Sequence, residues 1–308
     1  MGIVVIGAVF VDIKGFPEGN YNPSGRNVGH VEFVHGGVSR NVVEDIANME
    51  LRPTFLSIVD ESALGSEVLA KLENHKVNTA YVQRTPEGMG TWLAVFDNNG
   101  DLAGSISQRP NLLPILDVLN EKGDEIFSQA DSVVIEIDIN REIIKKVLEL
   151  ANKHHKRVFG LVSNMSIAIE RRDFIHNLDC FICNQLEAGQ LFVNDYSELN
   201  EKEMEKELKE RVVGGNIPSM VVTMGGKGAV YATAGGESGY CPARKVNVVD
   251  TTGAGDAFCA GLSAALTYGR SLKDAMEVGS MIAASVITSS ENVCPRFLPG
   301  ELGLSIQK

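Results

Sequence analysis

Residues 248–261 read VVDTTGAGDAFCAG, and this stretch decides both the fold and the position of the candidate site. After Asp256 the chain is rich in alanine, and apolar side chains recur at four-residue spacing up to Leu266. A helix is therefore expected to begin near Gly255 and to bury that face. The first N–H groups of a helix have no partner inside the helix, and small residues there let an anion reach the backbone. The stretch thus predicts an anion site at a helix N-terminus.

Asp256 falls in the first turn of this expected helix, where its charge would repel an anion bound at the same amides. Aspartate is also favoured in a first turn by capping and by the helix dipole alone, so position does not assign it a role. A carboxylate beside an anion site is, however, well placed to act as a base.

Along the rest of the chain, short β-branched runs alternate with longer amphipathic segments, which is the pattern of β-α-β units around a parallel sheet. Residues 141–155 are one such helical segment, with apolar side chains from Ile144 to Ala151 on one face. The expected buried strands are 3–9, 55–59, 132–135, 158–162, 181–183 and 220–223. The pattern predicts an α/β fold with a doubly wound, mostly parallel sheet, in a single domain over residues 1–308.

Two segments break the alternation, at about residues 14–35 and 91–107. The first is rich in Gly, Asn and Pro, and the second holds two apolar runs separated by the turn-forming sequence DNNGD at 97–101. Two separate surface hairpins would explain both segments. If they leave the core together, they form a small β-sheet lid over the end of the main sheet where α/β proteins bind ligands.

Composition excludes several classes of partner. The 308 residues carry a net charge of −12, which argues against nucleic acid and against an anionic membrane. The apolar N-terminus is short and lacks a basic leader, and no run is long enough to span a bilayer. Five cysteines do not suggest a disulfide framework, so a cytoplasmic location is expected. Cys180 and Cys183 lie in an apolar run and are expected to be buried strand residues rather than a metal site.

The string DTTGAGD at 250–256 resembles the D-T-x-G-A-G-D signature of the PfkB/ribokinase family, and other motifs extend the resemblance over nearly the full chain. The resemblance implies a ribokinase-like fold and an ATP-dependent kinase that phosphorylates a hydroxyl of a sugar or nucleoside. In that family the last aspartate deprotonates the acceptor hydroxyl, and the preceding amides stabilise the phosphoryl group in flight. The catalytic residues implied here are Asp256, Gly253, Ala254 and Gly255.

The acceptor-binding motifs of the family also have counterparts. GGVSRN at 36–41 resembles the N-terminal Gly-Gly motif, in which the glycines approach the sugar and the asparagine contacts its hydroxyls. Asp12 matches an early aspartate that binds substrate hydroxyls, and Asp138 occupies the place of another sugar-binding carboxylate, for which Glu136 competes. The implied substrate-binding residues are Asp12, Gly36, Gly37, Asn41 and Asp138.

Two further motifs concern the nucleotide. NQLE at 184–187 resembles the N-x-x-E motif, whose glutamate helps to organise Mg²⁺ and the phosphates, and TMGGKG at 223–228 resembles the T-x-G-x-x-G segment that borders the nucleotide. The implied ATP-binding residues are Asn184, Glu187, Thr223, Gly225 and Gly228, with Glu187 holding Mg²⁺ through water. Several family members bind a monovalent cation such as K⁺ near the position of Asp250. Lys227 is followed by glycine rather than Ser or Thr, so no Walker A loop is present, and it is expected to face solvent.

Variations within these motifs indicate which acceptor the protein phosphorylates. The variant GVSRN at 37–41, with Asn22-Pro23 and Asp138-Ile139-Asn140, is more similar to pseudouridine kinases than to ribokinases or fructokinases. The expected acceptor is therefore the 5′-hydroxyl of pseudouridine, with Arg40 offering a planar fork of donors to it. Against this, the spacing from Asn22 to Gly36 is expanded. The alternatives are a ribose, fructose or other nucleoside kinase of the family and, from another class, a sugar-binding regulator without catalysis.

The lid is expected to exclude water from the reaction. In the family the same sheet often carries the dimer contact. The resemblance therefore implies a homodimer through the lid, with the sugar or nucleoside and ATP as the small-molecule partners.

Overall fold

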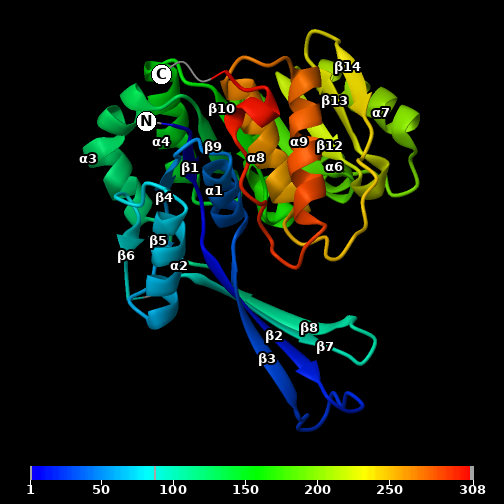
Figure 1. The fold of residues 1–308 in the computed structure, drawn as a ribbon. Coiled ribbons are helices and arrows are strands. Elements are labelled where there is room, and N and C mark those ends of the chain that lie inside the picture. The colour runs from blue at the N-terminus through cyan, green and yellow to red at the C-terminus, as the bar shows by residue number, and fades with distance from the viewer. Residues whose placement is uncertain (1, 87, 306–308) are drawn as a thin grey trace.

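Eight strands form the central sheet, in the order β14-β13-β12-β11-β10-β9-β1-β4 (Figure 1). The protein is described by a computed structural model that covers residues 2–86 and 88–305. The strands from β12 to β4 are parallel, and β13 and β14 add an antiparallel edge. The strands are β1 (Val4–Ile6), β4 (Thr54–Leu56), β9 (Val133–Glu136), β10 (Val158–Leu161), β11 (Cys180–Asn184), β12 (Ser219–Thr223), β13 (Ala229–Thr233) and β14 (Ser238–Cys241).

Helices cover both faces of this sheet, which explains why its strands are apolar runs rather than alternating ones. In β1, Val5 packs into one core while Val4 and Ile6 pack into the other, and all three are fully buried. The first core includes α1 (Val38–Asn48), α2 (Ala63–Asn74), α8 (Ala254–Thr267) and α9 (Leu272–Val286). The second includes α3 (Pro114–Gln129), α4 (Arg141–Lys153), α6 (Gln185–Phe192) and α7 (Glu201–Gly214).

The doubly wound α/β architecture is confirmed, and each expected strand overlaps an observed one. The segment 55–59 is wrong as a single strand, because it divides at Ser57, whose Oγ donates to the carbonyl oxygen of Gly7 at 2.6 Å. After that point β5 (Ile58–Val59) leaves the central sheet and pairs with β6 (Gln83–Arg84). The antiparallel hairpin of β13 and β14 had not been predicted. All five cysteines are free and buried.

A second, four-stranded sheet projects from the body of the molecule (Figure 1). Its order is β3-β2-β7-β8, with β2 (Phe10–Pro17), β3 (Gly29–Gly36), β7 (Gly90–Phe96) and β8 (Leu102–Gln108). The two segments that interrupt the α/β pattern therefore do meet in one small sheet, although its strands begin earlier than expected. Since β2 starts at Phe10, Asp12 lies within this sheet rather than in a loop after the first strand.

Within the described residues, no helix has the length and apolar character needed to cross a bilayer.

Candidate active site

The N-terminus of α8 brings Asp256 against α1 from the distant N-terminal part of the chain. The Asn41 side chain donates from Nδ2 to Oδ2 of Asp256 at 2.6 Å. Burial raises the pKa of the Asp256 carboxyl to about 7, while the Asn41 hydrogen bond and the charge of Arg40 act in the opposite direction. Asn41 Oδ1 is buried and has no hydrogen-bond partner among the described residues. The pair therefore presents a weakly acidic carboxyl and a free amide oxygen side by side.

Backbone geometry at the start of α8 depends on glycine. Gly253 has φ 81°, and a Cβ there would lie 2.1 Å from the carbonyl oxygen of Asn292. No side chain caps this helix, and a Cβ built on Gly255 would meet nothing within 4 Å, so the backbone at Gly255 is open to a ligand. The N–H of Ala254, in contrast, donates to the carbonyl oxygen of Thr251 at 3.2 Å. An anion at this terminus would thus meet Gly255 more readily than Ala254.

The Gly-Gly segment joins the lid to α1. Gly37 is the N-cap of α1 at φ 101°, and a Cβ there would lie 2.7 Å from the carbonyl oxygen of Ala8. The carboxylate of Asp12 folds over Gly36, where a Cβ would lie 2.7 Å from its oxygens. Burial raises the pKa of Asp12. Gly37 is therefore required by its backbone conformation and by close backbone packing, whereas a side chain at Gly36 would displace the Asp12 carboxylate.

Asp138 and Glu136, the two carboxylates that compete for one assignment, have different surroundings. Asp138 accepts hydrogen bonds from the backbone N–H and the Oγ of Ser163, at 3.0 and 2.7 Å, and pairs with Arg109 at 2.9 Å. Glu136 accepts from the N–H groups of Ala8 and Ser39 and supports the backbone beneath the Gly-Gly segment, and burial raises its pKa to about 8. Both side chains are buried. Asp138 is linked to the segments that follow β8 and β10, whereas Glu136 is linked to Ala8 after β1 and to the start of α1.

Asn184 and Glu187, the ends of the N-x-x-E motif, form a capping box at the start of α6. Asn184 Oδ1 accepts from the Glu187 N–H, and Glu187 Oε2 accepts from the Asn184 N–H, each at 2.8 Å. The box thus occupies one carboxylate oxygen of Glu187, and burial raises the pKa of this group. Glu187 lines a cavity of about 180 Å³. A half-buried carboxylate there suits a hydrated divalent cation, because oxygen ligands are those that Mg²⁺ prefers.

The turn after β12 follows the expected conformation of a glycine-rich loop. Gly225 and Gly228 have φ 56° and 102°, and the N–H of Met224 donates to the carbonyl oxygen of Gly228 at 2.7 Å. Lys227 is exposed, as expected, and its Nζ donates to the carbonyl oxygen of Leu199 at 3.2 Å.

Asp250 forms a small turn of its own at the surface. Its Oδ1 accepts from both the N–H and the Oγ1 of Thr252, at 2.9 and 2.8 Å, and the first of these bonds lowers the pKa of Asp250. In the described part of the chain, no cluster of three or more His, Cys, Asp or Glu side chains has the spacing of a metal site. The monovalent-cation prediction for Asp250 stays a prediction.

A cavity of about 180 Å³ brings several of the candidate residues together at the carboxyl ends of the parallel strands. Asn184, Glu187, Thr223, Gly255 and Asp256 all line it. Sequence reasoning did not single out Val38 and Cys259, which also line it, and residue type gave no signal for them. The other predicted site residues do not line this cavity; they are Asp12, Gly36, Gly37, Asn41, Asp138, Gly225, Gly228, Asp250, Gly253 and Ala254.

Arg40 does not have the expected role. Its side chain is only 1% exposed, and its three nitrogens are used inside the protein. Nε donates to the carbonyl oxygen of Gly36, Nη1 pairs with Glu44 at 2.7 Å, and Nη2 donates to the carbonyl oxygen of His35. Arg40 therefore braces the Gly-Gly segment, and it has no free fork of donors to offer to an acceptor.

Comparisons with known proteins identify the family of this chain. Residues 2–294 match the pfkB family carbohydrate kinases. The chain is 35% identical to the guanosine-inosine kinase of Exiguobacterium acetylicum over 94% of this chain and 95% of that protein. It is 25% identical to the pseudouridine kinase of Escherichia coli K12, over 94% and 93%. The ribokinase of Arabidopsis thaliana, solved with ribose and ATP, shares the fold at a TM-score of 0.81, with 19% identity over 97% of each chain.

The fold and these matches define a phosphotransferase that acts on a hydroxyl of a sugar or nucleoside. More particularly, the chain belongs to the PfkB family, with similarity to pseudouridine kinase and to guanosine-inosine kinase.

Proposed function

We propose that this protein is an ATP-dependent nucleoside kinase that phosphorylates the 5′-hydroxyl of its acceptor. The observation that carries this proposal is the contact between Asn41 and Asp256 at the open N-terminus of α8. It sets a carboxyl whose pKa is about 7 beside backbone that an anion can approach. Phosphoryl transfer asks chiefly for alignment, charge stabilisation and a base. Gly255 and Asp256 line one small cavity, and Asn41 holds Asp256 by a hydrogen bond from outside it.

In the proposed reaction, Asp256 accepts the proton of the acceptor hydroxyl while the hydroxyl oxygen forms a bond to the γ-phosphorus of ATP. The bond from that phosphorus to the bridging β–γ oxygen breaks, and ADP carries away the electron pair. A second hydroxyl of the acceptor would lie between Asp12 and Asn41 and donate to the free Oδ1 of Asn41. The amide of Gly255 faces the phosphoryl group during transfer.

ATP would lie along the carboxyl ends of β11 and β12, where Asn184, Glu187 and Thr223 line the cavity. The turn at Gly225 and Gly228 would border the nucleotide. Mg²⁺, when bound, neutralises charge on the triphosphate, and Glu187 would hold its water shell through the oxygen that the capping box leaves free.

A nucleoside acceptor is favoured over a free sugar because two of the similar proteins are named as nucleoside kinases, one of them 35% identical. That identity makes guanosine or inosine the first candidate. Pseudouridine is the second candidate, and it rests on the GVSRN variant at 37–41 and on the 25% match. Because Arg40 is buried, selection between these bases would have to come from other side chains.

A panel assay tests the proposal. ATP turnover is measured with guanosine, inosine, pseudouridine, uridine, ribose and fructose, and the product is located on the 5′-oxygen by phosphorus NMR. We expect a nucleoside to have the highest kcat/KM. If ribose or fructose leads the panel, the proposal of a nucleoside kinase is wrong, while membership of the family is unaffected.

Lid association is a further part of the proposal. Strand register places Phe33, Ile13, Leu93 and Ile106 in one row across the small sheet. Phe33, Leu93 and Ile106 are 57%, 40% and 70% exposed. An apolar row of this kind on a projecting sheet supports a homodimer formed through the lids of two copies.

A further inference from the structure

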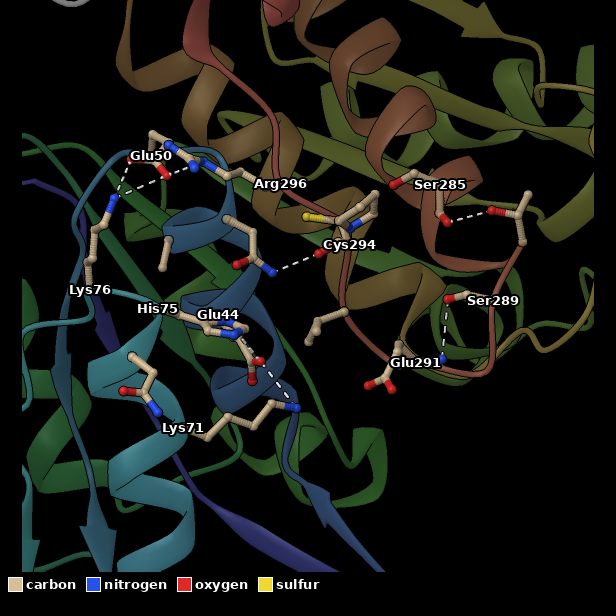
Figure 2. Close-up of a pocket in the computed structure, with 16 residues that line it drawn as sticks. Glu44, Glu50, Lys71, His75, Lys76, Ser285, Ser289, Glu291, Cys294 and Arg296 are labelled. Carbon is tan, nitrogen blue, oxygen red and sulfur yellow. Dashed lines mark hydrogen bonds and ion pairs between the residues drawn. The ribbon is translucent and has the colours of Figure 1, made fainter.

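A second cavity, larger than the one beside Asp256, lies on the other side of the segment that supports the start of α8. It has a volume of about 680 Å³ and lies between α1, the C-terminal end of α2, the end of α9 and residues 288–296 (Figure 2). This volume is in the range of small-molecule sites. None of the residues proposed above for acceptor, ATP or metal binding lines it.

The first charged cluster on its wall surrounds Glu50 (Figure 2). Lys76 Nζ lies 2.9 Å from Glu50 Oε2, and Arg296 Nε lies 2.6 Å from Glu50 Oε1. Two cations thus share one carboxylate, which leaves one formal positive charge in excess. The side chains of Lys76 and Arg296 are 51% and 66% exposed, so both can turn toward a ligand.

The second cluster surrounds Glu44, which is completely buried. Its Oε2 pairs with Arg40, while its Oε1 lies 3.2 Å from Lys71 Nζ and 3.1 Å from His75 Nδ1. Neither contact has hydrogen-bond geometry, since Glu44 Oε1 and His75 Nδ1 both lack a hydrogen-bond partner in the described part of the chain. Buried polar atoms nearly always have such a partner. Glu44 therefore retains the capacity to accept a hydrogen bond from a molecule in the cavity.

Three permanent cations (Lys71, Lys76 and Arg296) and three carboxylates (Glu44, Glu50 and Glu291) line the cavity. Arg40 does not line it, but it pairs with Glu44 from behind the wall, so Glu44 does not depend on the lining cations for its neutralisation. One cation of the Lys76 and Arg296 pair therefore remains in excess, in a chain whose net charge is −12. We propose that this cavity is a binding site for a phosphorylated metabolite, with the phosphate at Lys76 and Arg296 and a hydroxyl or N–H donor of the ligand at Glu44.

The wall of this cavity also touches the candidate active site, which makes the ligand an effector. Residues 288–296 form that wall, and the carbonyl oxygen of Asn292 packs against Gly253 so closely that no Cβ fits there. Asn292 Nδ2 donates to the carbonyl oxygen of His35 in lid strand β3 at 3.1 Å. The N–H of Cys294 donates to Asp45 on α1 at 2.6 Å. A ligand that draws Arg296 inward thus acts on a segment that contacts both the anion site and the lid.

Calorimetric titration without ATP or acceptor tests the site directly. The probes are inosine 5′-monophosphate and ribose 5-phosphate, with inosine as the uncharged comparison. The test protein is the double variant Lys76→Gln/Arg296→Gln, and the control is Lys122→Gln/Lys206→Gln, which removes two exposed lysines that each face one helical carboxylate. We expect the first variant to bind the phosphorylated probes roughly tenfold to a hundredfold more weakly, because a hydrogen bond to a charged group is lost.

Two results would overturn the proposal: no binding of either phosphorylated probe to the unaltered protein, or equal binding by the unaltered protein and the Lys76/Arg296 variant, which would locate the phosphate elsewhere. If the double variant does not fold, Arg296→Gln alone decides between the same outcomes, since that side chain is largely exposed. Inosine and its 5′-phosphate would also occupy the proposed acceptor site as substrate and product, so only the difference in binding between the unaltered protein and the Lys76/Arg296 variant reports on this cavity.

Discussion

At the scale of single residues, the protonation of Asp256 decides when the proposed reaction can run. Burial raises the pKa of this carboxyl to about 7, and only the ionised form can accept a proton. We therefore expect kcat/KM to fall by about tenfold for each pH unit below about 7. A pH profile of initial rates measures this, and a rate that stays level down to pH 5 would contradict it.

The Asn41→Ala variant separates this effect from protonation of the nucleotide. The hydrogen bond from Asn41 lowers the pKa of Asp256, so its removal should raise that pKa and move the acid limb to higher pH. Protonation of ATP would not move with the substitution. KM for the acceptor is also expected to rise, since Asn41 is proposed to contact it.

The role of Asp256 itself is tested by Asp256→Asn, which retains size and hydrogen bonding but removes the base. Turnover should fall by roughly two to four orders of magnitude, while acceptor binding persists. Asp117→Asn, an exposed aspartate in the first turn of α3, is the control for a simple helix-dipole effect. Near-normal turnover by a folded Asp256→Asn protein would exclude the proposed mechanism.

At the scale of helices and strands, sequence periodicity predicted the elements whose positions depend on the local sequence. The start of α8 follows from a glycine-rich turn before an alanine-rich run, and the buried strands follow from β-branched runs. The earlier start of β2 could not be predicted, because pairing with β7 extends it to Phe10.

Side-chain orientation was harder to predict than element position. Arg40 was expected to face the acceptor. It instead forms an ion pair with Glu44, which lies one helical turn further along α1. That i, i+4 spacing of opposite charges was a usable signal in the sequence. The contact of Asp138 with Arg109 and Ser163 joins three distant segments, and no local pattern reports such a contact.

Arg109 links the end of β8 to the central sheet, and its removal should affect stability. The Asp138 side chain is fully buried, so Arg109→Ala leaves that carboxylate without its cation. Because Arg109 is itself 31% exposed, we expect a loss of about 1–3 kcal/mol in the free energy of unfolding. Urea denaturation measures it. Arg141→Ala breaks an exposed ion pair with Asp173 and should cost less than about 1 kcal/mol; equal losses in the two variants would refute the argument.

The small sheet is predicted to close when the acceptor binds. If the small sheet closes over the acceptor, amide hydrogens of residues 91–107 should exchange about tenfold more slowly with saturating acceptor. Hydrogen exchange followed by mass spectrometry resolves this segment, with α4, which packs on the core through one face, as an internal reference. An unchanged exchange rate in 91–107 would show that the lid does not close.

At the scale of the whole molecule, one segment connects regions that are far apart in the sequence. Residues 288–296 lie between the larger cavity and the start of α8, and Asn292 reaches the lid through His35. The lid strands β2 and β3 in turn carry Asp12 and lead directly into the Gly-Gly segment. We therefore expect that lid closure, anion binding at the start of α8 and ligand binding in the larger cavity affect one another.

At the scale of the whole molecule, we predict that two copies associate through their lids. Ile106→Asp places a charge in the exposed apolar row and should convert a dimer to a monomer, as light scattering after size-exclusion chromatography would report. Leu102→Asp is the matched control on the same strand. Ile106 pairs with Leu93, whereas Leu102 pairs with Phe96 because the strand register shifts between Val95 and Phe96. Phe96 is three residues from Leu93 and so points to the other face of the sheet, which places Leu102 on the face opposite to the apolar row. A monomeric unaltered protein, or a dimer that survives Ile106→Asp, would show that the apolar row does not hold two copies together.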